Sequence, residues 1–362
     1  MRNFLLFIYC IILFGCEKNT VQPPLAEAPL YFPPIGTAEW QTTDPATLNW
    51  DTSKLPVLYN YLLQEDTRAF IVLQDGKIVL EKYFGQNIQG NGSFSQNSLW
   101  YWASAGKTLT GFIVGKAQQD GFLNISNKTS QYLGTGWTSA SPDKENLITV
   151  RHQLTMTTGL DDTGDQDNTN PSALTYHADA GRRWAYHNAP YTLLQQVVSN
   201  ASGQSFDAYF NAQLKTRIGM DGQWIINGYN HVYWSTARSM ARFGILMQAR
   251  GKWDDINILS DTSYLMASVN TSQNINLSYG YLWWLNGKSS FMVPQSQLVF
   301  PGSASSHAPA DMYSALGKDG QLLNIVPSKG LVMVRMGSSP NAGLVSLTLQ
   351  DGIWEKLKEV IR

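Results

Sequence analysis

The chain has 362 residues, 43% of them hydrophobic and 12% aromatic, which is enough to bury a large core in one big domain or two. Only 15% of the residues are charged and the formal net charge is −1, so the composition lacks the basic surface that nucleic-acid binding needs. The charged residues are replaced mainly by Asn, Gln, Ser, Thr, Trp and Tyr, which excludes a disordered chain. The composition as a whole also excludes collagen, a coiled coil, a polytopic membrane protein and a disulfide scaffold.

The first sixteen residues are typical of a secretory signal. Arg2 precedes an apolar run from Phe4 to Phe14, which is too short to span a bilayer and fits the hydrophobic part of a signal peptide. The run ends in Leu13-Phe14-Gly15-Cys16, which resembles a bacterial lipobox and implies cleavage before Cys16 and lipidation of that cysteine. We therefore expect a signal peptide at residues 1–15 and a protein anchored by lipid to a membrane of the bacterial cell envelope. An ordinary secretory signal or an uncleaved anchor is the alternative.

Residues 16–49 are predicted to form a tether. The segment combines small polar residues with six prolines, which favour an extended chain that does not pack (Pro23, Pro24, Pro29, Pro33, Pro34 and Pro45). The folded body is expected at residues 50–362. The two cysteines, Cys10 and Cys16, both precede it, so the body has no thiol chemistry and no disulfide.

The body begins and ends with hairpin patterns. Residues 69–84 form two apolar runs around Gln74-Asp75-Gly76, and residues 321–336 form two more around Pro327–Gly330. Between them, residues 104–265 mostly repeat apolar side chains at helical spacing, as does the closing segment from Asp351 to Ile361. The pattern predicts an α/β (α+β) fold: one antiparallel sheet built from both chain ends, flanking helices, and an inserted, mainly helical subdomain.

A serine and a lysine open the first central helix. Ser104 and Lys107 are three residues apart, so in a helix they share one face with Cβ atoms about 5–6 Å apart. A lysine whose pKa is lowered in a dry aromatic site can take the proton of a serine nucleophile, and a helix N-terminus favours developing negative charge. Tyr101 stands where a phosphate loop needs glycine, and Trp102 where a nucleophile elbow needs one, which argues against both motifs.

Two later motifs complete a constellation. Tyr186 and Asn188 can present a phenol and an amide from one loop, and Ala315 and Gly317 open a strand along which a substrate can lie. The ordered set Ser104-x-x-Lys107, Tyr186-x-Asn188 and Ala315-x-Gly317 resembles serine hydrolases of the β-lactamase/penicillin-binding superfamily. It is more closely similar to class C β-lactamase-related esterases and nylon-oligomer hydrolases. The resemblance runs from about residue 60 to 360 and implies a β-lactamase/transpeptidase-like fold, with the active site between the sheet and the helical subdomain.

The resemblance also implies roles for the residues. Ser104 would be the acylated nucleophile, Lys107 would assist its deprotonation, and Tyr186 would relay the proton and activate water. Asn188 would orient Lys107 and the acyl side of the substrate, and the backbone N–H groups of Ser104 and Lys318 would form the oxyanion hole. Either a neutral Lys107 or a Tyr186 phenolate could be the base for acylation, and we favour a coupled pair.

One departure from the family pattern bears on the substrate. β-Lactamases and transpeptidases have Lys or His, then Thr or Ser, then Gly, where this chain has Ala315-Leu316-Gly317. The missing cation would bind a substrate carboxylate, so we expect a small uncharged ester or amide substrate. A penicillin-binding D-amino-acid peptidase or carboxypeptidase, a β-lactamase, and a catalytically silent binding protein are the alternatives.

Other polar and aromatic residues are expected to be structural. His187, which could also be a triad base, is interpreted as a pocket wall or a hydrogen-bonding residue. His152 is interpreted as a structural residue at a helix start, and Trp283-Trp284 as core. Residues 161–167 are interpreted as a solvated loop at the cleft rim, because Asn170 and Tyr176 replace the Gly and Glu that a calcium loop needs. We expect no metal and no cofactor, and the oligomeric state stays open.

Overall fold

The computed structural model describes residues 29–339 and 343–361. The signal peptide expected at residues 1–15 and the lipidation site Cys16 lie outside this part of the chain. No helix within it is both long and apolar enough to cross a bilayer.

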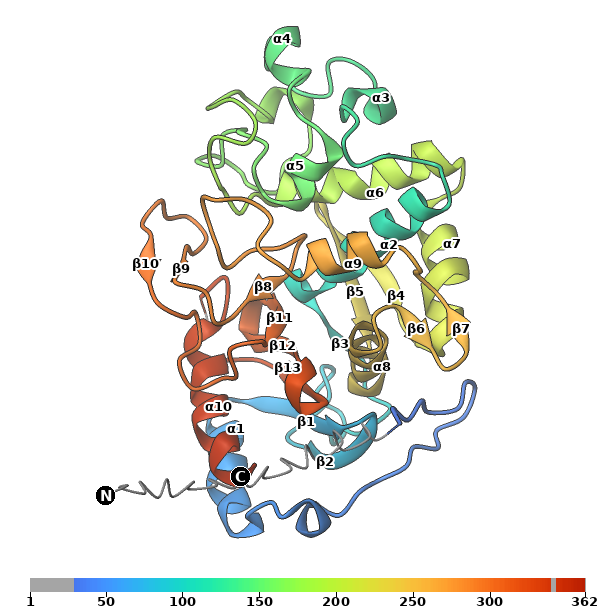
Figure 1. Ribbon diagram of the computed structural model, residues 1–362, viewed down its shortest axis with the longest axis vertical. Coiled ribbons are helices and arrows are strands. Elements are labelled where there is room, and N and C mark those ends of the chain that lie inside the picture. The colour runs from blue at the N-terminus through green and yellow to red at the C-terminus, as the bar shows by residue number, and fades with distance from the viewer. Residues whose placement is uncertain (1–28, 340–342, 362) are drawn as a thin grey trace, which may run out of the picture.

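One antiparallel sheet of six strands organises the body (Figure 1). Its order is β2-β1-β13-β12-β11-β8, so the first hairpin and the last lie side by side, with Ile71 paired to Val334. This confirms the prediction of a single sheet built from both chain ends. The strands are β1 Thr67–Gln74, β2 Lys77–Tyr83, β8 Trp284–Leu285, β11 Tyr313–Gly317, β12 Gln321–Val326 and β13 Leu331–Gly337.

Helices cover both faces of this sheet, which is why β11, β12 and β13 are buried at every residue. α1 (Leu55–Gln64) and α10 (Leu347–Val360) lie on one face, and α8 (Ala237–Gln248) lies on the other (Figure 1). Trp354 of α10 donates its indole N–H to the Asn324 side chain of β12 at 2.9 Å.

The remaining helices gather at one end of the molecule, above the sheet in Figure 1. Among them α2 is buried along nearly its whole length and packs on α6. They are α2 Lys107–Gln119, α3 Ser130–Leu133, α4 Pro142–Glu145, α5 Val150–Leu154, α6 Asn188–Ser202, α7 Phe206–Phe210 and α9 Thr262–Ser268.

The inserted region is less purely helical than the sequence predicts. β4 (Gln223–Asn227) and β5 (Asn230–Ser235) form a hairpin that pairs with β3 (Trp100–Tyr101) in a three-stranded sheet. Gly228 at the turn has a φ of +61°, a conformation that glycine adopts without strain. Two further ribbons are short, namely β6 Lys252–Trp253 with β7 Ile256–Asn257, and β9 Ser290–Phe291 with β10 Phe300–Pro301.

The tether prediction is wrong for residues 29–49, which lie on the body. The Arg242 guanidinium donates to the carbonyl oxygens of Pro33 and Pro34 at 3.1 and 2.8 Å, and the Trp40 indole donates to the Gly76 carbonyl at 2.8 Å. Leu30, Phe32 and Trp40 pack against the core. An extended proline-rich chain leaves its carbonyls free, and here those carbonyls satisfy a buried guanidinium.

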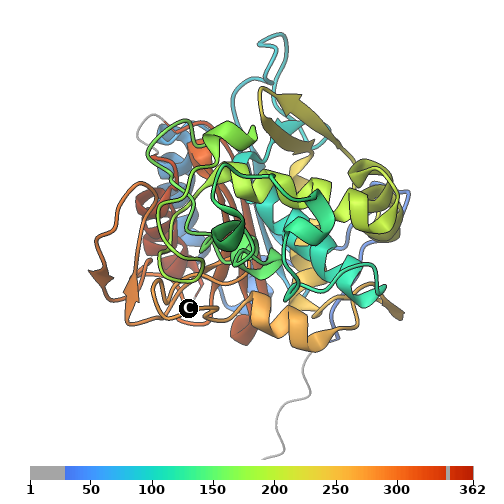
Figure 2. The same cartoon turned by 90° about the horizontal axis from the view of Figure 1, so that it is seen from above.

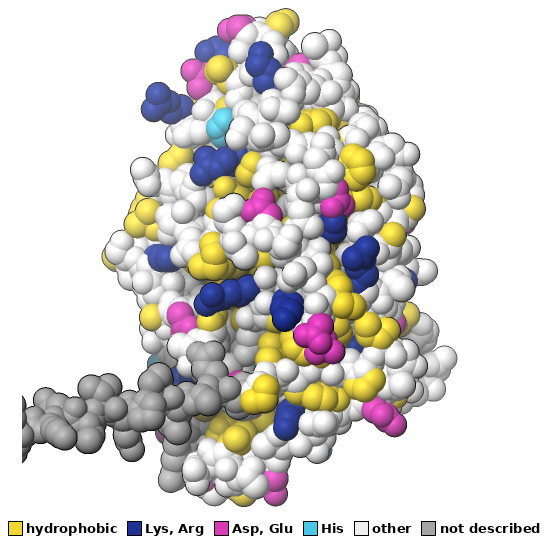
Figure 3. Space-filling view, turned by 45° about the vertical axis from the view of Figure 1, so that its right-hand side comes forward, with side chains coloured by type: hydrophobic (Ala, Val, Ile, Leu, Met, Phe, Trp, Pro, Cys, Tyr) yellow, Lys and Arg dark blue, Asp and Glu magenta, His cyan; other side chains and the backbone are white. Residues whose placement is uncertain are grey.

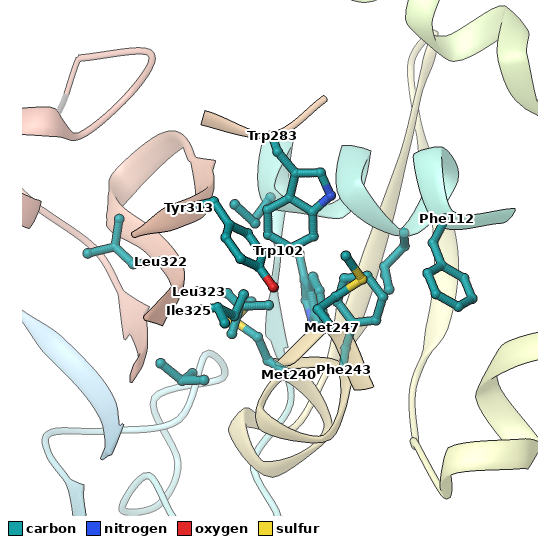
Figure 4. Packing of buried hydrophobic residues seen from close by; sticks show 14 of the residues in the cluster. Trp102, Phe112, Met240, Phe243, Met247, Trp283, Tyr313, Leu322, Leu323 and Ile325 are labelled. Carbon is teal, nitrogen blue, oxygen red and sulfur yellow. The ribbon is translucent and has the colours of Figure 1, made fainter. Parts of the chain in front are cut away.

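The core behind β3 and α2 is aromatic (Figure 4). Trp102 is fully buried and lies edge-on to Tyr233 at 5.5 Å between ring centroids, and its indole N–H donates to the Ser235 hydroxyl at 2.7 Å. Trp283 and Trp284 are 1% and 3% exposed, which confirms their prediction as core residues. This packing holds the turn that follows Trp102 in place.

Candidate active site

Ser104 lies on a tight turn between β3 and α2. Trp102 anchors the start of the turn through its N–H, which donates to the Tyr233 carbonyl at 2.8 Å. Ala103 then takes a φ of +46°, which is strained for a residue with a Cβ, and a 3₁₀ turn runs from Ala103 to Gly106. Lys107 is the first residue of α2, so the predicted helical pair spans the junction of the turn and the helix.

Lys107 and Tyr186 converge on the Ser104 hydroxyl. The Lys107 Nζ donates to Ser104 Oγ at 2.9 Å, and the Tyr186 hydroxyl is hydrogen-bonded to the same serine. Lys107 and Tyr186 are each only 4% exposed. The ammonium also lies 5.0 Å from the Tyr186 ring centroid and 4.4 Å from that of Tyr191. Side chains about eighty residues apart in the sequence thus enclose one hydroxyl.

This burial changes the titration of both basic candidates. Loss of hydration lowers the pKa of Lys107 to about 7, and the negative charge of Asp167 raises it only in part. Burial raises the pKa of the Tyr186 phenol well above its usual value, although the hydrogen bond with Ser104 lowers it in part. Near neutral pH a neutral lysine is therefore accessible and a tyrosinate is not.

The Ser104 turn opens onto a cavity of about 300 Å³. Lys107, Tyr186, Asn188 and Lys318, all predicted as site residues, line it. So does Asp167, which places the end of the 161–167 loop at the cleft as expected. Asp167 acts on two residues of the site: its charge raises the pKa of Lys107, and its carboxylate accepts a hydrogen bond from the Asn188 side chain.

Asn188 makes a contact that differs from the expected one. Its side-chain N–H donates to Asp167 Oδ1 at 2.7 Å rather than orienting Lys107 directly. Its amide oxygen is buried and has no hydrogen-bond partner within the described residues. The sequence analysis placed the loop that contains Asp167 at the rim of the cleft, but it did not predict the hydrogen bond between Asp167 and Asn188.

Gly317 allows β11 to reach the nucleophile. A Cβ on this glycine would lie 2.4 Å from the Trp102 carbonyl oxygen and 3.1 Å from the Ala105 nitrogen, so only glycine lets the strand touch the turn. Lys318 follows directly. Its loop is held by buried Arg335, which donates to the carbonyls of Asp319 and Gly320 at 2.7 and 2.9 Å.

Ala315, the other predicted strand residue, is fully buried in β11 and does not line the cavity. It precedes Gly317, the strand residue that touches the Ser104 turn, by two positions in β11. The side chain that replaces the family's cation is therefore part of the strand's packing rather than of the cavity surface.

The β4–β5 hairpin supplies one wall of the cavity, and the sequence analysis missed it. Asn227, Asn230, His231 and Val232 all line the cavity, and His231 Nδ1 lies 2.7 Å from the Gln195 side-chain oxygen. The Asn227-Gly228 pair between alternating apolar residues is the signal that could have revealed this hairpin.

The remaining histidine predictions divide. His152 closes a capping box with Thr149 at the start of α5, which confirms its structural interpretation. His187 is buried but does not line the cavity, so it is not a pocket wall, and its buried Nδ1 has no hydrogen-bond partner among the described residues. Burial lowers the pKa of His187 to about 4. Across residues 29–339 and 343–361, no three His, Cys, Asp or Glu side chains are placed to hold a metal ion.

Charged side chains on the face shown in Figure 3 are scattered, with both signs interspersed. No large patch of one charge sign is visible among the described residues on this face. Among the described residues of the cavity wall, Asp167 and Lys318 are the only ones, besides Lys107, that ordinarily carry a charge at neutral pH.

The comparisons with known proteins agree with this geometry. The model of the Beta-lactamase family matches residues 64–344. An uncharacterized protein of Alkalihalophilus pseudofirmus is 24% identical over 301 residues, which cover 75% of this chain and 83% of that protein.

Two solved structures illustrate the similarity of fold. A protein from Bacillus anthracis assigned as a 6-aminohexanoate-dimer hydrolase has a TM-score of 0.65 at 17% identity, covering 84% of this chain and 83% of that one. A penicillin-binding protein homolog from Caulobacter crescentus has a TM-score of 0.67 at 13% identity, covering 88% and 98%. These neighbours confirm the expected β-lactamase/transpeptidase-like fold.

Proposed function

The chain belongs to the β-lactamase family, within the superfamily of β-lactamase-like and penicillin-binding serine hydrolases, and from this premise we propose that it hydrolyses a small ester or amide through an acyl-enzyme on Ser104. The observation that carries the proposal is the 2.9 Å contact between Ser104 Oγ and a buried Lys107 whose pKa is lowered to about 7. A serine in such a contact can lose its proton to the amine at physiological pH.

In the acylation step, neutral Lys107 takes the hydroxyl proton while Ser104 Oγ attacks the carbonyl carbon. The carbonyl oxygen becomes an oxyanion and accepts hydrogen bonds from the backbone N–H groups of Ser104 and Lys318. Loss of one such hydrogen bond typically costs about 10²–10³ in rate. The C–O or C–N bond then breaks, and the leaving group takes a proton from the Lys107–Tyr186 pair.

Deacylation uses the same groups in reverse order. Water enters from the side of the departed alcohol or amine and gives its proton to the same pair, and its oxygen attacks the acyl carbon. The bond from that carbon to Ser104 Oγ then breaks, the pair returns the proton to Ser104 Oγ, and the acid leaves. Because the pKa of Tyr186 is raised, the phenol acts as a proton carrier between Lys107 and the leaving group or water rather than as a standing base.

The substrate is proposed to be uncharged. β11 carries Ala315-Leu316-Gly317 where related β-lactamases and transpeptidases carry a cation for the substrate carboxylate. The alternative, a D-amino-acid peptidase or a β-lactamase, would have to bind that carboxylate through Lys318, whose exposed side chain lies at the cavity mouth.

A fluorophosphonate probe tests the proposal. We expect it to label the wild-type protein and not Ser104→Ala. The control Ser126→Ala changes an exposed serine that does not line the cavity and should be labelled like the wild type. Hydrolysis of p-nitrophenyl acetate should follow the same pattern. An unlabelled wild-type protein would favour the silent binding protein, and equal labelling by a fluorescent penicillin would favour the penicillin-binding alternative.

We also propose that the protein resides at the cell envelope through lipid on Cys16, on the strength of the Leu13–Cys16 sequence. Detergent-phase partitioning tests this: the wild type should enter the detergent phase and Cys16→Ser should not. Equal partitioning of both would contradict the anchor.

A further inference from the structure

A second cavity, of about 540 Å³, adjoins the catalytic one. The two share four lining residues, Ala103, Asn227, Val232 and Lys318. Ala103 directly precedes the proposed nucleophile, and Lys318 carries a proposed oxyanion-hole N–H. The second cavity therefore lies next to the position that the carbonyl carbon of a substrate would occupy.

The walls of this second cavity are mainly apolar. Ile88 and Ile225, which are 42% and 38% exposed, line this space from two different segments, and Val232 lines it from the strand position paired with Ile225. The ring centroids of Trp234 and Tyr101 lie 5.5 Å apart, and the Tyr101 hydroxyl donates a hydrogen bond to the Asp319 carboxylate at 2.8 Å. Exposed large apolar side chains are ordinarily scattered singly, so their convergence on one cavity indicates a binding surface.

Two projecting segments form this surface. Figure 2 shows the loop that precedes β3 and the β4–β5 hairpin extending together from one edge of the molecule. Ile88 belongs to the loop and Ile225 to the hairpin, and both line the cavity. The surface is thus built by elements outside the main sheet, beside the nucleophile rather than behind it.

The placement of the proton carriers decides which part of a substrate could enter. Lys107 and Tyr186 line the catalytic cavity but not the apolar one. A leaving group must depart within reach of its proton donor, so it occupies the catalytic cavity. The acyl chain, on the other side of the carbonyl carbon, is then the part that can extend into the apolar cavity. This placement differs from the expected role of Asn188 toward the acyl side, because Asn188 lines the catalytic cavity and not the apolar one.

We propose that the apolar cavity is the acyl subsite of the enzyme and that it selects uncharged esters or amides of alkyl or aryl acids larger than acetate. This inference rests on the proposed function of Ser104. During turnover the acyl carbon bonds to Ser104 Oγ as its bond to the alcohol or amine breaks, and the released group carries away a proton. Water then releases the acid, so neither half of the cycle needs an oxidant or a reductant.

A series of p-nitrophenyl esters with a constant leaving group tests the subsite. Each methylene that becomes buried should raise kcat/KM by up to about fourfold, so hexanoate should exceed acetate by tenfold or more. Ile225→Ser should lower the hexanoate-to-acetate ratio of kcat/KM by about fivefold, and Ile88→Ser, in the other segment, should lower it as well. The matched control, Ile256→Ser, changes a 51% exposed isoleucine on β7 that lines neither cavity and should keep the wild-type ratio.

The outcomes separate the two proposals. An active enzyme with equal kcat/KM for all chain lengths overturns the acyl subsite and leaves the Ser104 mechanism standing. So does a length preference that both isoleucine variants retain at the wild-type ratio. Absence of ester turnover together with absence of fluorophosphonate labelling at Ser104 overturns the proposed function itself, and the subsite with it.

Discussion

The titration of Lys107 offers a direct test of how the site works. Burial lowers its pKa from 10.5 to about 7, which corresponds to a penalty of about 5 kcal/mol on the charged form of this fully enclosed amine. If the neutral amine is the base, kcat/KM should be constant above the pKa and fall about tenfold for each pH unit below it. The profile of p-nitrophenyl acetate hydrolysis should therefore bend near pH 7 after subtraction of the Ser104→Ala rate.

A single carboxylate can move this bend in a known direction. The charge of Asp167 raises the pKa of Lys107, so Asp167→Asn should shift the bend to lower pH and make the variant relatively more active in acid. The substitution keeps a side-chain oxygen to accept the Asn188 N–H. Asp165→Asn, on the exposed part of the same loop, is the matched control and should leave the bend unchanged.

Two further variants distinguish the possible bases. Lys107→Arg should be inactive, because a guanidinium stays charged throughout this range. Tyr186→Phe should lose about 10²–10⁴ in rate as a proton carrier is removed, yet keep its bend near pH 7. A wild-type bend above pH 9, or loss of the rising limb in Tyr186→Phe alone, would refute the assignment of Lys107 as the base.

Three other outcomes follow from the structure. Lys107→Met should raise the free energy of unfolding near pH 7 by several kcal/mol, as measured by urea denaturation. Because the pKa of Lys107 is lower in the folded than in the unfolded state, the stability of the wild type should rise between about pH 7 and pH 10. The stability advantage of Lys107→Met over the wild type should therefore shrink over the same range. Gly317→Ala should lower kcat/KM by 10² or more, since its Cβ would meet the Trp102 carbonyl oxygen at 2.4 Å, whereas Gly164→Ala has open space and should retain activity. Arg242→Met should cost about 1–3 kcal/mol and expose residues 29–49 to limited proteolysis, because it removes the donors that hold this segment; an unchanged cleavage pattern would contradict that role.

The sequence contained the short-range features of this protein. Turn residues between apolar runs predicted the hairpins at 69–84 and 321–336, and their apolar character on both faces is explained by helices on both sides of one sheet. The three-residue spacing of Ser104 and Lys107 predicted their contact from local geometry, although the pair spans a 3₁₀ turn and the first residue of α2. Similarity to a known family extended the prediction to Tyr186 and Lys318.

The tertiary structure decided what surrounds these residues. Residues 29–49 lie on the body because a buried Arg242 needs acceptors that only the folded chain reveals. The contact of Asn188 with Asp167, and the apolar cavity shared by Ile88 and Ile225, join segments far apart in the sequence. Their meeting depends on the packing of whole elements, for which no local pattern is a guide. The pKa of Lys107 belongs to the same class, because it depends on the side chains that exclude water from the amine rather than on the lysine itself.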